Sequence, residues 1–86
     1  MRDIIELKLK SEIVQIAKII GIDNKDLFNV GQFDKKIFAF KGVINEYHFG
    51  RVYALAELYF EIFKEINPFG EFVELIVSYD LENSNN

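Results

Sequence analysis

Two rows of apolar residues run side by side along residues 49–66 (FGRVYALAELYFEIFKEI) and constrain the fold more than any other feature. Within each row the residues are three or four positions apart, which places them on one face of an α-helix. The aromatic row is Phe49, Tyr53, Ala56, Phe60 and Phe63, and the aliphatic row is Val52, Leu55, Tyr59, Ile62 and Ile66. Because one row is enough to dock a helix on one neighbour, two rows predict a helix with two neighbours.

The composition is typical of one folded domain. The chain has 86 residues, of which 50% are hydrophobic and 28% are charged, so it does not belong to the disordered class. No apolar run is long enough to span a bilayer, and there is no cysteine for a disulfide framework or a thiolate site. We expect one domain over residues 1–80, a polar and disordered tail over residues 81–86, no membrane contact and a cytoplasmic location.

The charge is distributed unevenly along the chain. The formal net charge is −4, yet residues 1–41 hold eight bases and six acids, whereas residues 42–86 hold two bases and eight acids. An acidic half repels phosphate backbones. The charge therefore disfavours direct binding of nucleic acid.

The first twenty residues permit two interpretations. Ile5, Leu7 and Leu9 alternate with charged residues, which is typical of a half-buried strand over residues 3–10. Ser11 would then cap a helix that ends at Gly21, a residue suited to a left-handed helix cap. The second interpretation is one continuous helix over residues 3–20. We rank it second because the alternation is regular over residues 5–10.

The rest of the chain divides into short apolar segments separated by glycine, proline and polar residues. Residues 43–48 are compatible with a strand extension, a hairpin arm or the start of a helix. The predicted elements are a weak strand over 27–33, a strand over 36–41, a helix over 49–66, a turn over 67–70 and a strand over 71–80. With the strand over 3–10 and its helix, this order predicts a ferredoxin-like βαββαβ fold of the α+β class. Two helices would cover one face of a four-stranded antiparallel sheet.

One segment resembles a nucleic-acid-binding motif. Residues 36–43 (KIFAFKGV) resemble the RNP1 strand of RNA-recognition domains, which the resemblance would place in the third strand with Phe38 and Phe40 stacked on bases. However, the first strand offers Ile5 where the partner motif has an aromatic residue. Turning both phenylalanines outward would also bury Lys41, which costs free energy. The preferred orientation therefore points Phe38 and Phe40 toward the core.

No group of residues indicates catalysis, a cofactor or a metal. His48 is the only histidine, and it has no cysteine to activate. Asp23 and Asp26 lack the spacing of a calcium loop, and the isolated glycines do not form a phosphate-binding loop. We therefore expect a protein that is not an enzyme and binds no cofactor or metal.

Excess apolar surface on the long helix points to a partner. The predicted first helix spans about ten residues and the second about eighteen, so part of the aromatic row should extend beyond its neighbour. The residues expected to bind a partner are the aromatic residues Tyr53, Phe60 and Phe63 and the acidic stripe Glu57, Glu61 and Glu65. These features favour a small interaction module that forms a homodimer or docks on a protein partner.

Two other functional classes follow from the sequence. The acidic half is compatible with an inhibitor of the viral or mobile-element type, which blocks a nucleic-acid-handling enzyme by presenting carboxylates in place of phosphates. The predicted βαββαβ order is compatible with a regulatory domain that binds a small ligand, because many domains of that order do so between subunits. The sequence does not identify the partner in any of these classes.

Overall fold

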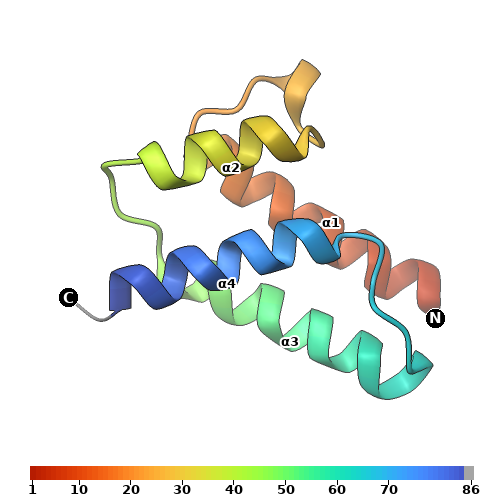
Figure 1. The fold of residues 1–86 in the computed structure, drawn as a ribbon. Coiled ribbons are helices and arrows are strands. Elements are labelled where there is room, and N and C mark those ends of the chain that lie inside the picture. Colours follow the sequence, from red (N-terminus) through yellow and green to blue (C-terminus); the bar gives the residue numbers. More distant parts are fainter. Residues whose placement is uncertain (85–86) are drawn as a thin grey trace.

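The computed structural model of this chain describes residues 1–84, and their regular structure is entirely helical (Figure 1). The elements are α1 (Arg2–Ile19), the short 3₁₀-helix η1 (Asn24–Asp26), α2 (Val30–Ala39), α3 (Glu46–Phe63) and α4 (Gly70–Ser84). No strand occurs among these residues. The predicted α+β ferredoxin-like fold, with its four-stranded sheet, is therefore wrong.

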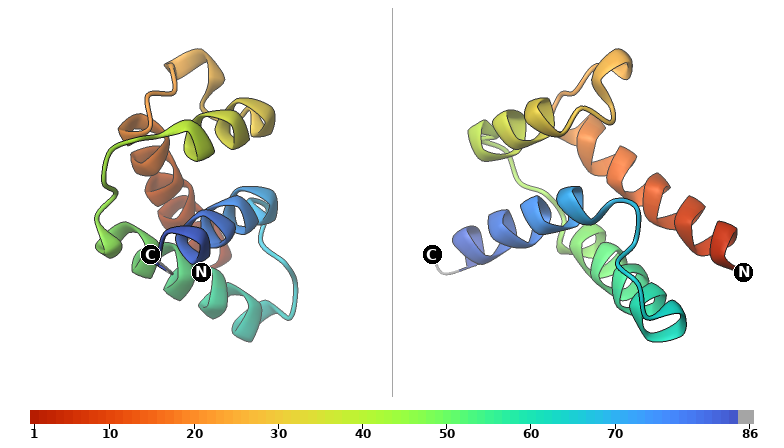
Figure 2. Two further views of the ribbon diagram at one scale, coloured as in Figure 1. Left: turned by 60° about the vertical axis from the view of Figure 1, so that its left-hand side comes forward. Right: turned by 45° about the vertical axis from the view of Figure 1, so that its right-hand side comes forward.

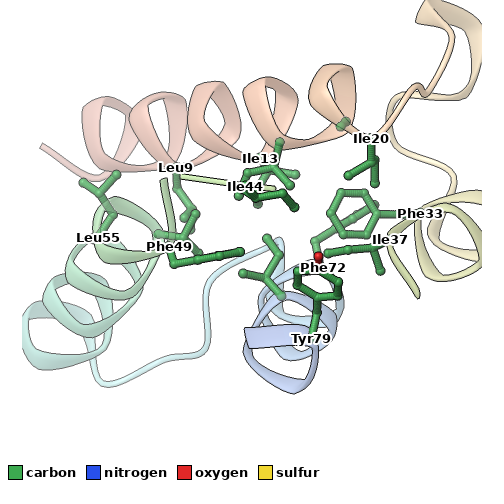
Figure 3. Close-up of a cluster of buried hydrophobic side chains, with 14 of the residues drawn as sticks. Leu9, Ile13, Ile20, Phe33, Ile37, Ile44, Phe49, Leu55, Phe72 and Tyr79 are labelled. Atoms are coloured by element: carbon green, nitrogen blue, oxygen red, sulfur yellow. The ribbon is translucent and has the colours of Figure 1, made fainter. Parts of the chain in front are cut away.

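The four α-helices pack as a small bundle around one shared apolar core. In Figures 1 and 2, α2 and α4 run in the same direction, whereas α3 runs back toward the opposite end. Figure 3 shows that side chains of α1 meet side chains from α2, α3 and α4 in one apolar cluster. The largest side chains with no exposed surface are Leu9, Ile13 and Ile16 of α1, Phe33 and Ile37 of α2, Val52 of α3 and Ile76 of α4.

The predicted strand over residues 3–10 is part of α1, and the second interpretation, a continuous helix, is confirmed. Ile5, Leu9, Ile13 and Ile16 are buried, and their spacing of three or four residues follows one face of a helix. Leu7, which the alternating pattern places beside Leu9, is 66% exposed. Burial against three other helices therefore decides between two patterns that the same residues satisfy.

Glycine ends α1 as the sequence predicts. Gly21 has a left-handed φ of 90°, and its backbone N–H donates to the carbonyl of Lys18 at 3.2 Å. The N–H of Ile22 donates to the carbonyl of Ala17 at 2.9 Å, which completes a Schellman-type cap.

The predicted strands over residues 27–33, 36–41 and 71–80 are also wrong. Residues 30–39 form α2, which buries Phe33 and Ile37, and α4 buries Phe72, Ile76 and Tyr79. These spacings of three and four residues fit a helix, although the same segments also alternate. The segment that resembles RNP1 lies in α2 and the loop after it, so it does not form the strand that base stacking would require.

The long predicted helix is present with shifted ends. Residues 46–48 belong to α3, and the side chain of Asn45 caps it by accepting the N–H of Tyr47 at 2.8 Å. At its other end, Lys64 has a left-handed φ of 56°, so the helix stops before Ile66. α3 contacts α1 on one side and α4 on another. The two neighbours predicted from the two apolar rows are confirmed, but both are helices.

The last described residues belong to α4. The residues 81–84 lie in this helix, and they are four of the six residues expected to form a polar tail. The other two, residues 85 and 86, lie outside the described residues.

The opposite environments of two neighbouring leucines provide a test of the helical fold. We expect Leu9→Ala to lower the free energy of unfolding by about 3 kcal/mol because it leaves a cavity in the core. Leu7→Ala, two residues away, should change it by no more than about 0.5 kcal/mol, because Leu7 is on the surface. Urea unfolding at concentrations where the protein is monomeric measures both values. Equal losses would indicate a strand with both leucines on one face.

Candidate partner-binding surface

Three polar contacts set the register between α1 and α3. Nη1 of Arg2 lies 3.2 Å from Oε2 of Glu65, just beyond the end of α3. The hydroxyl of Tyr59 donates to Glu6 at 2.8 Å, and Nε of Arg51 donates to Glu12 at 3.2 Å. Each step forward along α1 is therefore matched by a step back along α3, as expected for antiparallel helices.

This register brings four exposed apolar residues to matching levels. Ile4 lies level with Ile62, and Leu7 lies level with Leu58; their exposed fractions range from 41% to 66%. Leu58 and Ile62 follow Arg51 by seven and eleven residues, which places them on the same side of α3 as the half-exposed Arg51. We call the four residues Ile4, Leu7, Leu58 and Ile62 the α1/α3 outer face.

Further exposed apolar side chains lie at both ends of this pair of helices. Met1 and Ile66 are each 78% exposed at the end where α1 begins and α3 stops. At the other end, Ile19 and Tyr47 are both exposed. Exposed apolar side chains therefore occur near both ends of the helix pair as well as along it.

Two of the predicted partner-binding aromatic residues make contacts within the protein. The hydroxyl of Tyr53 donates to Oδ2 of Asp80 on α4 at 2.6 Å. The ring of Phe63 lies 4.8 Å from the ring of Tyr59, and the guanidinium of Arg2 lies 4.5 Å from its centroid. Both Tyr53 and Phe63 are half-buried. They contribute to packing of α3 on α4 and α1.

The other predicted residues remain accessible. Phe60 is 54% exposed, and Glu57, three positions before it, lies beside it on the helix surface. Glu61 follows Phe60 directly in the sequence. Both carboxylates are exposed, and within residues 1–84 neither has an ion-pair partner. Glu65 is exposed too, but it pairs with Arg2. The predicted site therefore keeps Phe60 and its acidic neighbours on the surface.

Sequence reasoning missed the contribution of α1 to the exposed apolar surface. Ile4 and Leu7 are three residues apart, and Leu58 and Ile62 are four apart, so each pair lies together on a helix. The pairs become one candidate surface only when the register between α1 and α3 is known. The aliphatic row, expected to be covered, instead leaves Ile62 and Ile66 exposed.

His48 lies close to an ion pair and not to a nucleophile. Its Nδ1 is buried without a hydrogen bond, 3.9 Å from Oε2 of Glu12, the carboxylate that pairs with Arg51. Among residues 1–84, no three His, Cys, Asp or Glu side chains gather so that they could hold a metal ion. Over the same residues, no helix combines the length and the apolar character needed to cross a membrane.

Two tyrosines have a raised pKa. Burial, followed by the hydrogen bond to Asp80, raises the pKa of Tyr53 well above its ordinary value of 10.0. The hydrogen bond to Glu6, followed by burial, raises the pKa of Tyr59. In both cases the carboxylate accepts a hydrogen bond from the phenolic hydroxyl and disfavours a second negative charge beside it, so these groups hold helices together and do not supply an acid or base near neutral pH.

Comparison of this chain with protein-family models, with curated proteins and with solved structures finds no match.

The contact between Tyr53 and Asp80 predicts how stability depends on pH. Because folding raises the pKa of this phenol, its contribution is fully present below about pH 10 and is lost as the pH rises above that value. Tyr53→Phe should lower the free energy of unfolding by about 1 kcal/mol near pH 7. It should also make the decline above about pH 10 shallower, as measured by urea unfolding.

Tyr47→Phe is the matched control, because Tyr47 is exposed and its hydroxyl makes no hydrogen bond within the described residues. It should leave unchanged both the free energy of unfolding near pH 7 and its decline above about pH 10. A Tyr53→Phe protein that loses stability with pH as steeply as the wild type would contradict this assignment.

Proposed function

We propose that this chain is a small, non-enzymatic interaction module that forms a homodimer through the α1/α3 outer face. The observation that carries the proposal is the alignment of four exposed aliphatic side chains on two neighbouring helices. Single exposed apolar residues are ordinary on protein surfaces, whereas a contiguous group is typical of an interface.

A second copy of the chain fits this face because the face is self-complementary in charge. Lys8 lies one turn after Ile4 on α1, and Glu57 lies next to Leu58 on α3; both are exposed. A twofold axis parallel to the helices would place α1 of one copy over α3 of the other, in the same register. Lys8 of each copy would then approach Glu57 of the other, and aliphatic residues would meet between them.

The size of the face suits a modest interface. α1 and α3 have 18 residues each, so the pair presents a surface about 27 Å long and about 20 Å wide. Pairing two such surfaces covers about 1,000 Å², which is at the lower end for a specific protein interface. We therefore expect reversible association that depends on protein concentration.

The acidic inhibitor stays a second candidate because Glu57 and Glu61 are exposed and have no ion-pair partner within the described residues. Such an inhibitor would bind a basic enzyme surface, and its binding would weaken steeply with salt. The small-ligand alternative depended on the βαββαβ order and loses that basis with the helical fold.

Light scattering at increasing protein concentration tests the dimer. We expect the wild type to approach twice the mass of one chain, and Ile4→Asn combined with Ile62→Asn to raise the dissociation constant at least about tenfold by removing apolar contacts. Val43→Asn is the control, because Val43 is 92% exposed and lies in the loop before α3. Circular dichroism should show that all variants retain their helices.

A second variant distinguishes the outer face from the aromatic row. Phe60→Asn should leave the association unchanged. If Phe60→Asn abolishes the dimer and the variant with Ile4 and Ile62 replaced retains it, the interface lies on the aromatic row. A wild-type protein that stays monomeric at the highest attainable concentration would remove self-association altogether.

A further inference from the structure

A shallow groove of about 650 Å³ lies between α2 and α4, apart from the α1/α3 outer face. Figure 1 shows these two helices one above the other and running in the same direction. The groove is lined by Val30 and Asp34 of α2 and by Glu71, Val73, Glu74, Leu75, Val77 and Ser78 of α4. Every lining residue is thus aliphatic, acidic or a serine, and none is basic.

The groove combines an apolar floor with an acidic rim. Val30, Val73, Leu75 and Val77 are half-buried, so each still offers apolar surface. Asp34, Glu71 and Glu74 are exposed and have no ion-pair or hydrogen-bond partner within residues 1–84.

Only part of this acidity has a structural explanation. Glu71 lies in the first turn of α4, where a carboxylate is favourable against the helix dipole. Glu74 is three residues further along the same helix and is repelled by Glu71. Asp34 lies across the groove on α2, with no base nearby among the lining residues. Glu74 and Asp34 therefore gain nothing from the folded chain itself.

The groove is continuous with a second hollow of about 470 Å³. This hollow shares Glu71, Val73 and Glu74 with the groove, and it adds Ile66 and Pro68 from the loop before α4. From Gly70 to Ser78, α4 supplies nine residues, or about 13 Å of helix. That length matches between two and three turns of a bound helix.

We propose that this groove binds a cationic amphipathic helix, that is, a protein segment whose apolar stripe is flanked by Lys or Arg. The apolar stripe would cover the valines and Leu75, and the flanking cations would pair with Asp34 and Glu74. Phosphate-bearing ligands are excluded by the three carboxylates. The proposal does not depend on the dimer, because the α1/α3 outer face contributes no residue to the groove.

The test uses a fluorescein-labelled synthetic peptide of about 18 residues, composed of Leu and Lys in amphipathic order, which is long enough to form a helix. Fluorescence anisotropy should show saturable binding to the full-length protein. A peptide of the same composition in scrambled order should bind at least about tenfold more weakly, because it has no apolar stripe. A peptide with Glu in place of Lys should not bind.

Two pairs of matched variants locate the site. Asp34→Lys with Glu74→Lys should raise the dissociation constant about tenfold. Asp23→Lys with Glu46→Lys makes the same change in net charge and should raise it less than about twofold, since those exposed residues lie outside the groove. Val77→Asn should weaken binding without a change in charge, whereas Leu81→Asn, one turn further along α4, should not.

Equal weakening by the two lysine pairs would mean that the peptide responds to overall acidity, and it would overturn the proposal. Absence of saturable binding by the wild type would overturn it as well. If Asp34→Lys with Glu74→Lys abolishes self-association in light scattering, the groove belongs to a second copy of the chain, and the proposal of a cationic helix is wrong. Unchanged peptide binding by the variant with Ile4→Asn and Ile62→Asn would support a groove that is independent of the dimer.

Discussion

The fold depends on the burial of one apolar stripe of α1. Leu9, Ile13 and Ile16 have no exposed surface, and Leu9 and Ile13 lie in one apolar cluster with side chains from all three other α-helices (Figure 3). In a chain of this size the favourable and unfavourable contributions to folding nearly cancel, so one shared stripe has a large effect on stability. α4 contacts both α2 and α3, and these two contacts complete the bundle.

The long helix could be predicted from the sequence, whereas the other helices were predicted in part as strands. The difference lies in the spacing of their apolar residues. Over residues 49–63 the three-and-four spacing persists for several turns, and no alternating pattern competes with it. Ile5, Leu7 and Leu9 alternate, yet Ile5, Leu9 and Ile13 also follow a helix face. Phe72, Ile76 and Tyr79 present the same ambiguity with the alternating valines of α4. When apolar residues are this dense, the same segment fits both the alternation of a strand and the three-and-four spacing of a helix. Only burial in the tertiary structure then selects one of them.

The candidate site, too, could be predicted only as far as local sequence patterns reach. Exposure of Phe60 and the acidic stripe follows from the helix alone, because those residues lie away from its buried face. The partners of Tyr53 and Phe63 come from distant parts of the chain: Asp80 on α4 and Arg2 on α1. No local pattern predicts these contacts, and for that reason the sequence overestimated the free aromatic surface. The exposed Ile4 was missed because an assumed strand left α1 too short to match α3.

The distribution of charge links the two proposed surfaces. α1 contributes Lys8 to one face of the bundle, and this base complements Glu57 on α3 of a second copy. The carboxylates of Asp34 and Glu74 are on α2 and α4, outside the α1/α3 outer face, so self-association would not neutralise them. A dimer would instead present two acidic grooves. A partner with two cationic helices could then bind both, and the second contact would gain from a high effective concentration. Association through α1 and α3 would in this way strengthen binding at α2 and α4 without any shared residue.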